Sequence, residues 1–117
     1  MVRLWKAFLN TLYGLGWALR YETAVREEFV AFAIAFPVSF FVAPNVAWWL
    51  ALIGSLMALI IVELLNTAIE KLSDHVTPEH SHAIKVVKDL GSAAVFIALV
   101  LAFIIWCAAL ALRLSLL

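Results

Sequence analysis

Uncharged stretches long enough to form membrane helices alternate with short charged stretches along the chain. One of them runs from Val46 to Val62, seventeen residues without a charge. The pattern predicts three transmembrane helices, over residues 29–43, 46–65 and 92–112. At 1.5 Å per residue, the first of these covers only about 22 Å of a hydrocarbon core about 30 Å thick. We still assign it as a span, because a tight turn at residues 43–45 leads directly into the second span.

The segments outside the spans show helical patterns of their own. Residues 1–28 are expected to form an amphipathic helix in the membrane interface, followed by a charged cytoplasmic segment. The apolar positions of that helix recur every three or four residues and are Trp5, Phe8, Leu12, Leu15 and Leu19. Residues 66–91 are expected to form a cytoplasmic helix-loop-helix, whose first helix ends before Pro78. The predicted fold class is therefore an all-α integral membrane protein with a single domain over residues 1–117.

Composition supports the membrane assignment. The chain is 67% hydrophobic and 14% charged, with a mean hydropathy of +1.09. A soluble domain of this length could not cover so much apolar side chain. All eight acidic residues and seven of the eight Lys/Arg residues fall within 1–28 and 63–89. Because short positively charged segments stay in the cytoplasm, we expect both segments and the N-terminus to be cytoplasmic.

A polar stripe follows directly after the uncharged part of the second span. It lies on one helical face, because its members recur at intervals of three and four residues. The members are Glu63, Asn66, Thr67, Glu70 and Asp74. An ordinary helix leaving the membrane would carry charges of both signs spread around its surface. The gathering of acids and an amide on one face instead favours a chemical role.

The charged residues near the membrane suit phosphoryl transfer. Carboxylates and an amide are the oxygen ligands of a hard cation such as Mg²⁺, which usually shares them with substrate phosphates. Lys88 and Asp89 stand just before the third span, on the same side of the membrane as the stripe. A lysine there can neutralise phosphate oxygens. The chain has no G-x-x-x-x-G-K-[ST] loop and no glycine-rich kinase loop. Any nucleotide site must therefore be of another kind.

The stripe and the sequence around Lys88 carry a family resemblance. Glu63-Leu-Leu-Asn66-Thr-Ala-Ile-Glu70, with Asp74 and then Lys88-Asp89-Leu-Gly91-Ser92, resembles the small bacterial membrane kinases of diacylglycerol and undecaprenol. The resemblance covers nearly the whole chain. It implies a homotrimer of three-span subunits, an active site shared between neighbours, and the use of ATP with Mg²⁺. No nucleic-acid partner is expected.

The resemblance also implies roles for individual residues. Glu63 would be the catalytic base on the lipid hydroxyl, and Glu22 and Glu70 would hold the metal. The implied ATP contacts are Arg3, Glu22, Glu70, Glu79, Lys88 and Asp89. Asn66 and Asp74 would support the site. The residues implied at the lipid substrate are Arg3, Glu63, Ser92 and Trp106.

Two alternatives remain open at this point. Within the enzyme class, the entry to the third span favours diacylglycerol as the substrate, whereas the Asn66 to Lys71 run leans toward undecaprenol. Outside it, the chain could form a small oligomeric cation channel or exporter whose polar stripe lines the path. The acids cluster at one end of the spans and no charge lies at mid-membrane, which argues against the channel.

Overall fold

The computed structural model describes residues 1–77 and 81–117. Within these residues the chain forms four helices and no strand: α1 (Val2–Tyr21), α2 (Thr23–Val42), α3 (Val46–Val76) and α4 (His82–Arg113). The prediction of an all-α protein is confirmed. The helix that carries the polar stripe is predicted to end before Pro78, and this is confirmed: α3 runs without a break from the second span to Val76.

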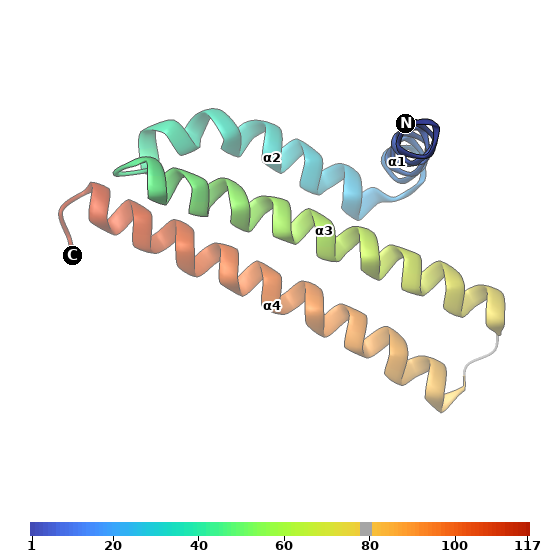
Figure 1. The fold of residues 1–117 in the computed structure, drawn as a ribbon. Helices are drawn as coiled ribbons and strands as arrows, with labels where there is room; N and C mark the ends of the chain where they lie inside the picture. The colour runs from blue at the N-terminus through green and yellow to red at the C-terminus, as the bar shows by residue number, and fades with distance from the viewer. Residues whose placement is uncertain (78–80) are drawn as a thin grey trace.

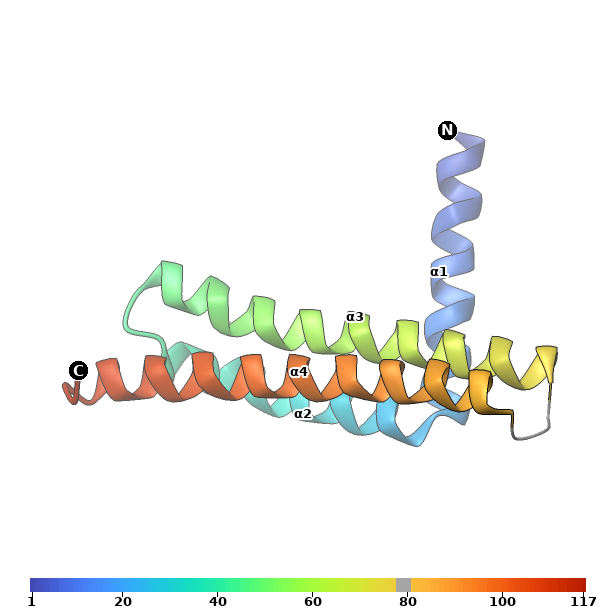
Figure 2. The same ribbon diagram turned by 90° about the horizontal axis from the view of Figure 1, so that it is seen from below.

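Three of the helices form an elongated bundle. Figure 1 shows α2, α3 and α4 side by side, with α3 between the other two, and α3 running antiparallel to both. The remaining helix, α1, projects away from one end of the bundle (Figure 2). This arrangement suits a surface helix that lies in the membrane interface while the bundle crosses the membrane.

Two helices are long and apolar enough to span a membrane. These are α3, with 31 residues, and α4, with 32 residues. At 1.5 Å per residue each is about 47 Å long, so each extends well beyond a core of about 30 Å. The excess of both helices lies at the end that carries the polar stripe. The predicted first span lies within α2, which also contains three consecutive charged residues at 26–28, so it does not meet the same criterion.

The central helix packs through one stripe of its surface. Five of its buried positions recur at intervals of three and four, and they are Leu52, Ser55, Leu59, Glu63 and Thr67; Ser73 is also buried, nearer the end of the helix. The covered positions of α4 are Gly91, Ala102 and Ala109, all of them small. Small residues let two helix backbones approach closely, which is how membrane helices associate in the absence of a strong hydrophobic drive.

Short polar contacts define the connections between the helices. Arg26, in the first turn of α2, donates from Nη1 to the carbonyl oxygen of Arg20 (2.9 Å) and also to that of Leu19 (3.3 Å). It therefore satisfies carbonyl groups at the end of α1 that have no partner within the helix. Asn45 begins α3 by accepting from the backbone N–H of Trp48 at 3.0 Å. Ser81 begins α4 in the same way, accepting from Ile84 at 3.2 Å.

The opposite end of the bundle is held by aromatic packing. The indole N–H of Trp49 on α3 donates to the hydroxyl of Ser39 on α2 at 2.9 Å. The ring of Trp49 stacks on Phe40 with a centroid distance of 5.3 Å. These contacts fasten α2 to α3 near Pro37, where α2 lacks one backbone hydrogen bond.

Candidate active site

Glu63 lies at the centre of the polar end of the bundle. Only 7% of its surface is exposed, and the same holds for Thr67 one turn later. The carboxylate lies within electrostatic range of Glu70 on the same helix and of Glu22 at the junction of α1 and α2. No lysine or arginine among the described residues forms an ion pair with it. Glu63 is therefore a buried carboxylate surrounded by other carboxylates.

A fourth acid, Glu28, joins this group from α2. Its Oε2 atom is buried and has no hydrogen-bond partner in the part of the chain that the structure describes. Burial, and secondarily the charge of Glu63, raises the pKa of Glu28 from 4.5 to about 7. Sequence reasoning did not assign a role to this residue. The available signal was its position as the last charged residue before the first uncharged run.

The raised pKa of Glu28 predicts a dependence of stability on pH. Because the folded protein binds this proton more tightly than the unfolded chain, Glu28 contributes stability below its ordinary pKa of 4.5, and this contribution is lost as the pH rises to about 7. We expect Glu28→Gln, which cannot ionise, to reduce the fall in Tm between about pH 5 and pH 8 by a few degrees. Thermal unfolding in detergent micelles measures this difference.

Glu27→Gln is the matched control, because Glu27 is the neighbouring residue on the same helix and is exposed. It should leave the dependence of Tm on pH as it is in the wild type. Equal pH dependence in the wild type and in Glu28→Gln would contradict the burial of a protonated carboxyl at Glu28.

Asn66 is positioned by a close contact between α3 and α4. Its Nδ2 donates to Glu70 Oε1 at 3.3 Å, so it fixes one oxygen of that carboxylate. Its Oδ1 is buried and unpartnered within the described residues. It lies directly against Gly91 of α4, where a Cβ atom would clash with it. Gly91 is thus the second residue whose role the sequence did not reveal, although a glycine inside a helix is a known indication of close packing.

We expect Gly91→Ala to destabilise the protein. An added Cβ would force Asn66 or the α4 backbone to move, and overpacking of this kind costs about 1–3 kcal/mol. Gly16→Ala is the control, because nothing lies within 4 Å of a Cβ at that exposed position. Both substitutions improve helix propensity, so only the steric effect separates them. Equal Tm values for the two variants in detergent would show that α4 can move away without cost.

The outer end of the site joins α3 to α4 through charge. Lys88 Nζ lies 2.7 Å from Asp74 Oδ1. The hydrogen bond and charge of Lys88 hold the pKa of the exposed Asp74 carboxyl below its usual value. Asp89 instead pairs with Lys85 on its own helix at 2.6 Å. Lys88 and Asp89, the two nucleotide contacts predicted on α4, therefore differ in their partners: Lys88 pairs with α3, and Asp89 pairs within its own helix.

Glu22 connects the surface helix to the site. It is the residue between α1 and α2, and its Oε1 lies 3.1 Å from Lys71 Nζ on α3. Within residues 1–77 and 81–117, no three His, Cys, Asp or Glu side chains form a set that could hold a metal by themselves. One or two carboxylates are nevertheless what Mg²⁺ uses when nucleotide phosphates supply its other ligands. The acids of this site fit that mode of binding.

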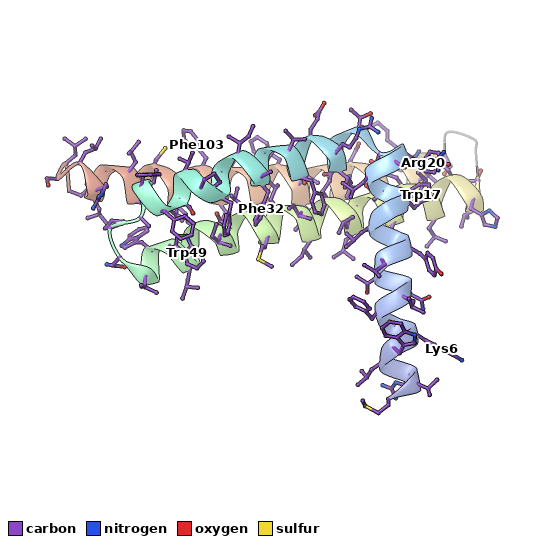
Figure 3. The ribbon with its side chains drawn as sticks, turned by 90° about the horizontal axis from the view of Figure 1, so that it is seen from above. Lys6, Trp17, Arg20, Phe32, Trp49 and Phe103 are labelled. Atoms are coloured by element: carbon purple, nitrogen blue, oxygen red, sulfur yellow. The ribbon has the colours of Figure 1, made fainter. Side chains whose placement is uncertain are left out.

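Other predicted site residues lie apart from this cluster in the single chain. Arg3 lies near the free end of α1, where Figure 3 labels Lys6. Arg3 and Lys6 line the same shallow hollow. Trp106 follows Ser92 by fourteen positions on α4, about 21 Å along the helix. Its indole nitrogen is buried and has no partner among the described residues. Glu79 lies outside the described residues.

Comparison with known proteins identifies the family of this chain. A family model described as prokaryotic diacylglycerol kinase matches residues 10–110. The chain is 38% identical to a diacylglycerol kinase of Escherichia coli K12 over 90% of this chain and 86% of that protein. It is 36% identical to a diacylglycerol kinase of Haemophilus influenzae over 82% and 81% of the two chains. It is 35% identical to one of Pseudomonas aeruginosa over 89% and 85%. The chain with this carboxylate-lined helical site therefore belongs to the prokaryotic diacylglycerol kinase family and is a kinase.

Proposed function

We propose that this kinase transfers the γ-phosphate of ATP to the primary hydroxyl of diacylglycerol, giving phosphatidic acid and ADP at the cytoplasmic face of the membrane. One observation carries the proposal: a buried carboxylate, Glu63, stands where the uncharged part of α3 ends. A lipid with acyl chains presents its hydroxyl at this depth. The three bacterial relatives described above are named diacylglycerol kinases.

Glu63 takes the role of general base. The hydroxyl oxygen forms a new bond to the γ-phosphorus, the bond from that phosphorus to the β,γ-bridging oxygen breaks, and the hydroxyl proton passes to the Glu63 carboxylate. The absence of an ion-pair partner among the described residues supports this role, because a carboxylate held by a cation would be a weaker base.

The remaining acids and the lysine serve the nucleotide. Glu22 and Glu70 hold Mg²⁺, which when bound neutralises charge on the phosphates. Asn66 supports this by binding one oxygen of Glu70. Asp74 holds the Lys88 ammonium in place for a phosphate. Arg3, Glu79 and Asp89 complete the nucleotide contacts, and Arg3, Ser92 and Trp106 contact the lipid.

We propose a homotrimer of three-span subunits for the working enzyme. Arg3 and Trp106 lie far from Glu63 along their helices, so residues of neighbouring subunits are needed to complete the site. The turn at residues 43–45 joins α2 directly to α3, which favours α2 as the additional span despite its charged first turns. The distribution of Lys and Arg favours a cytoplasmic location for both charged segments. The bacterial relatives favour the inner membrane as the location of the enzyme.

A radiolabel assay in mixed micelles tests the proposed reaction. The enzyme receives Mg-ATP labelled at the γ-phosphate, with diacylglycerol and undecaprenol offered separately. We expect label chiefly on diacylglycerol. Label chiefly on undecaprenol would keep the mechanism and reverse the choice of lipid. Label on neither lipid would contradict the proposed function, and ion flux in liposomes would then examine the channel alternative.

A further inference from the structure

The ion pair between Lys71 and Glu22 has no place in the phosphate-transfer steps described above. It joins the junction of α1 and α2 to α3, with Nζ and Oε1 3.1 Å apart. Glu22 is mostly covered, with 20% of its side chain exposed, whereas Lys71 is 55% exposed. Lys71 follows Glu70 directly in the sequence. A cation of the protein itself therefore occupies one of the two carboxylates that we assign to the metal.

We propose that Lys71 is a resident counter-cation that neutralises Glu22 while the nucleotide site is empty and leaves it when the metal binds. The inference rests on the proposed function, because it requires Glu22 to be a metal ligand. A carboxylate that accepts Mg²⁺ must lose its contact with the ammonium, since both compete for the same oxygen. Only molecules in which the pair is open can bind the metal at Glu22. The apparent metal affinity of the empty enzyme is therefore reduced in proportion to the fraction of molecules in which the pair is formed.

A second group holds the ammonium of Lys71 while it is paired with Glu22. Its Nζ lies 5.6 Å from the centroid of the Trp17 ring, a distance at which a cation is attracted to the ring face. An apolar groove of about 370 Å³ between α1 and α3 is lined by Lys71 together with Trp17, Ala18 and Leu64. The groove leaves room for the side chain to move along Trp17 once Glu22 is taken by the metal. Figure 3 shows Trp17 at the end of α1 that meets the bundle.

The pair also holds the surface helix while the site is empty. Besides it, the described ion pairs link α3 to α4 through Lys88 and join two residues within α4. Loss of the Lys71 ammonium should therefore loosen the junction of α1 and α2 in the metal-free enzyme. A metal bound at Glu22 would supply a new contact to this carboxylate in place of the lost ion pair with Lys71.

Binding of Mn²⁺ to the purified enzyme in detergent micelles tests the proposal. Electron paramagnetic resonance counts free Mn²⁺ without and with a non-hydrolysable ATP analogue. We expect Lys71→Met to bind Mn²⁺ more tightly than the wild type by about two- to fivefold, because half-exposed ion pairs are weak. Lys71→Arg keeps the charge and should bind Mn²⁺ much as the wild type does. Arg113→Met, which removes a positive charge from the opposite end of the bundle, controls for the change in net charge.

The outcomes separate failure of this inference from failure of the proposed function. Equal Mn²⁺ affinity in Lys71→Met and the wild type, or weaker binding in the presence of the nucleotide analogue, would overturn the counter-cation role. The second result would make Lys71 a phosphate ligand instead. Unchanged Mn²⁺ affinity in Glu22→Gln would also overturn it, by removing Glu22 from the metal site. Absence of phosphate transfer by the wild type would contradict the proposed function, whatever the Mn²⁺ affinities are.

Thermal unfolding supplies a readout that does not depend on catalysis. We expect Lys71→Met to lower the Tm of the metal-free enzyme and to lower it less at saturating Mn²⁺, because the metal then replaces the lost contact. An equal loss of Tm with and without Mn²⁺ would show that the pair persists in the metal-bound state, which contradicts the proposal.

Discussion

Replacement of Glu63 by Gln is expected to reduce phosphate transfer to diacylglycerol by about 10²- to 10⁴-fold, the usual contribution of a general base. Gln has nearly the same shape and keeps a side-chain oxygen, but it cannot take up the hydroxyl proton. Nucleotide binding should remain close to that of the wild type, because the metal and phosphates are held by other residues. Single-turnover transfer and equilibrium binding of a labelled ATP analogue measure the two effects separately.

The control for this substitution is Glu27→Gln, which removes an exposed acid from the same end of the bundle. It should leave the transfer rate within about twofold of the wild type, as surface substitutions usually do. Loss of nucleotide binding in Glu63→Gln would identify Glu63 as a metal ligand rather than a base. Full activity in Glu63→Gln would require another residue, such as Glu28, which is close enough to feel the charge of Glu63, to accept the proton.

Replacement of Glu70 by Gln should raise the Mg²⁺ concentration needed for half-maximal transfer by at least about tenfold. Loss of a group that merely orients a metal ligand commonly costs 10–100-fold, and loss of the ligand's charge should cost no less. The amide of Gln can still accept the hydrogen bond from Asn66, which now reaches Glu70 Oε1 at 3.3 Å. The fold around Asn66 and Gly91 should therefore persist, and Tm should change little.

Asn66→Asp separates the metal role of Glu70 from its hydrogen bond. This variant cannot donate to Glu70, and it places a further negative charge beside it, which repels the carboxylate but attracts Mg²⁺. Its Mg²⁺ requirement should shift less than that of Glu70→Gln. An unchanged Mg²⁺ dependence in Glu70→Gln would remove Glu70 from the metal site. It would leave Glu22 as the acid to test next.

The helices of this protein could be predicted from local pattern. Long uncharged runs predicted α3 and α4 as membrane helices, because a helix satisfies all of its backbone hydrogen bonds within the segment where a bilayer offers no water. Pro78 set the end of α3, since the residue before a proline avoids helical backbone. The polar face from Glu63 to Asp74 followed from helical periodicity alone. Only α2 departed from a simple pattern, because its helix includes the charged residues at 26–28.

The contacts between helices could not be predicted in this way, because they depend on distances between residues far apart in the sequence. Helical periodicity placed Lys88 and Asp74 on surfaces of their own helices, but only the antiparallel packing of α3 and α4 joins them. The approach of Gly91 to Asn66 depends on how deeply the two helices interlock. The raised pKa of Glu28 arises from burial against α3.

A helical membrane protein with a row of acids where α3 leaves the apolar region can be predicted from sequence alone. Hydrophobicity and helical spacing are local properties, so they can be read directly from the amino-acid sequence. Tertiary structure decided which acids share the electrostatic environment of Glu63 and which cation neutralises Glu22. Those contacts bring together α1, α2 and α3, and side-chain packing with the polar contacts at their junction selects how the three helices meet.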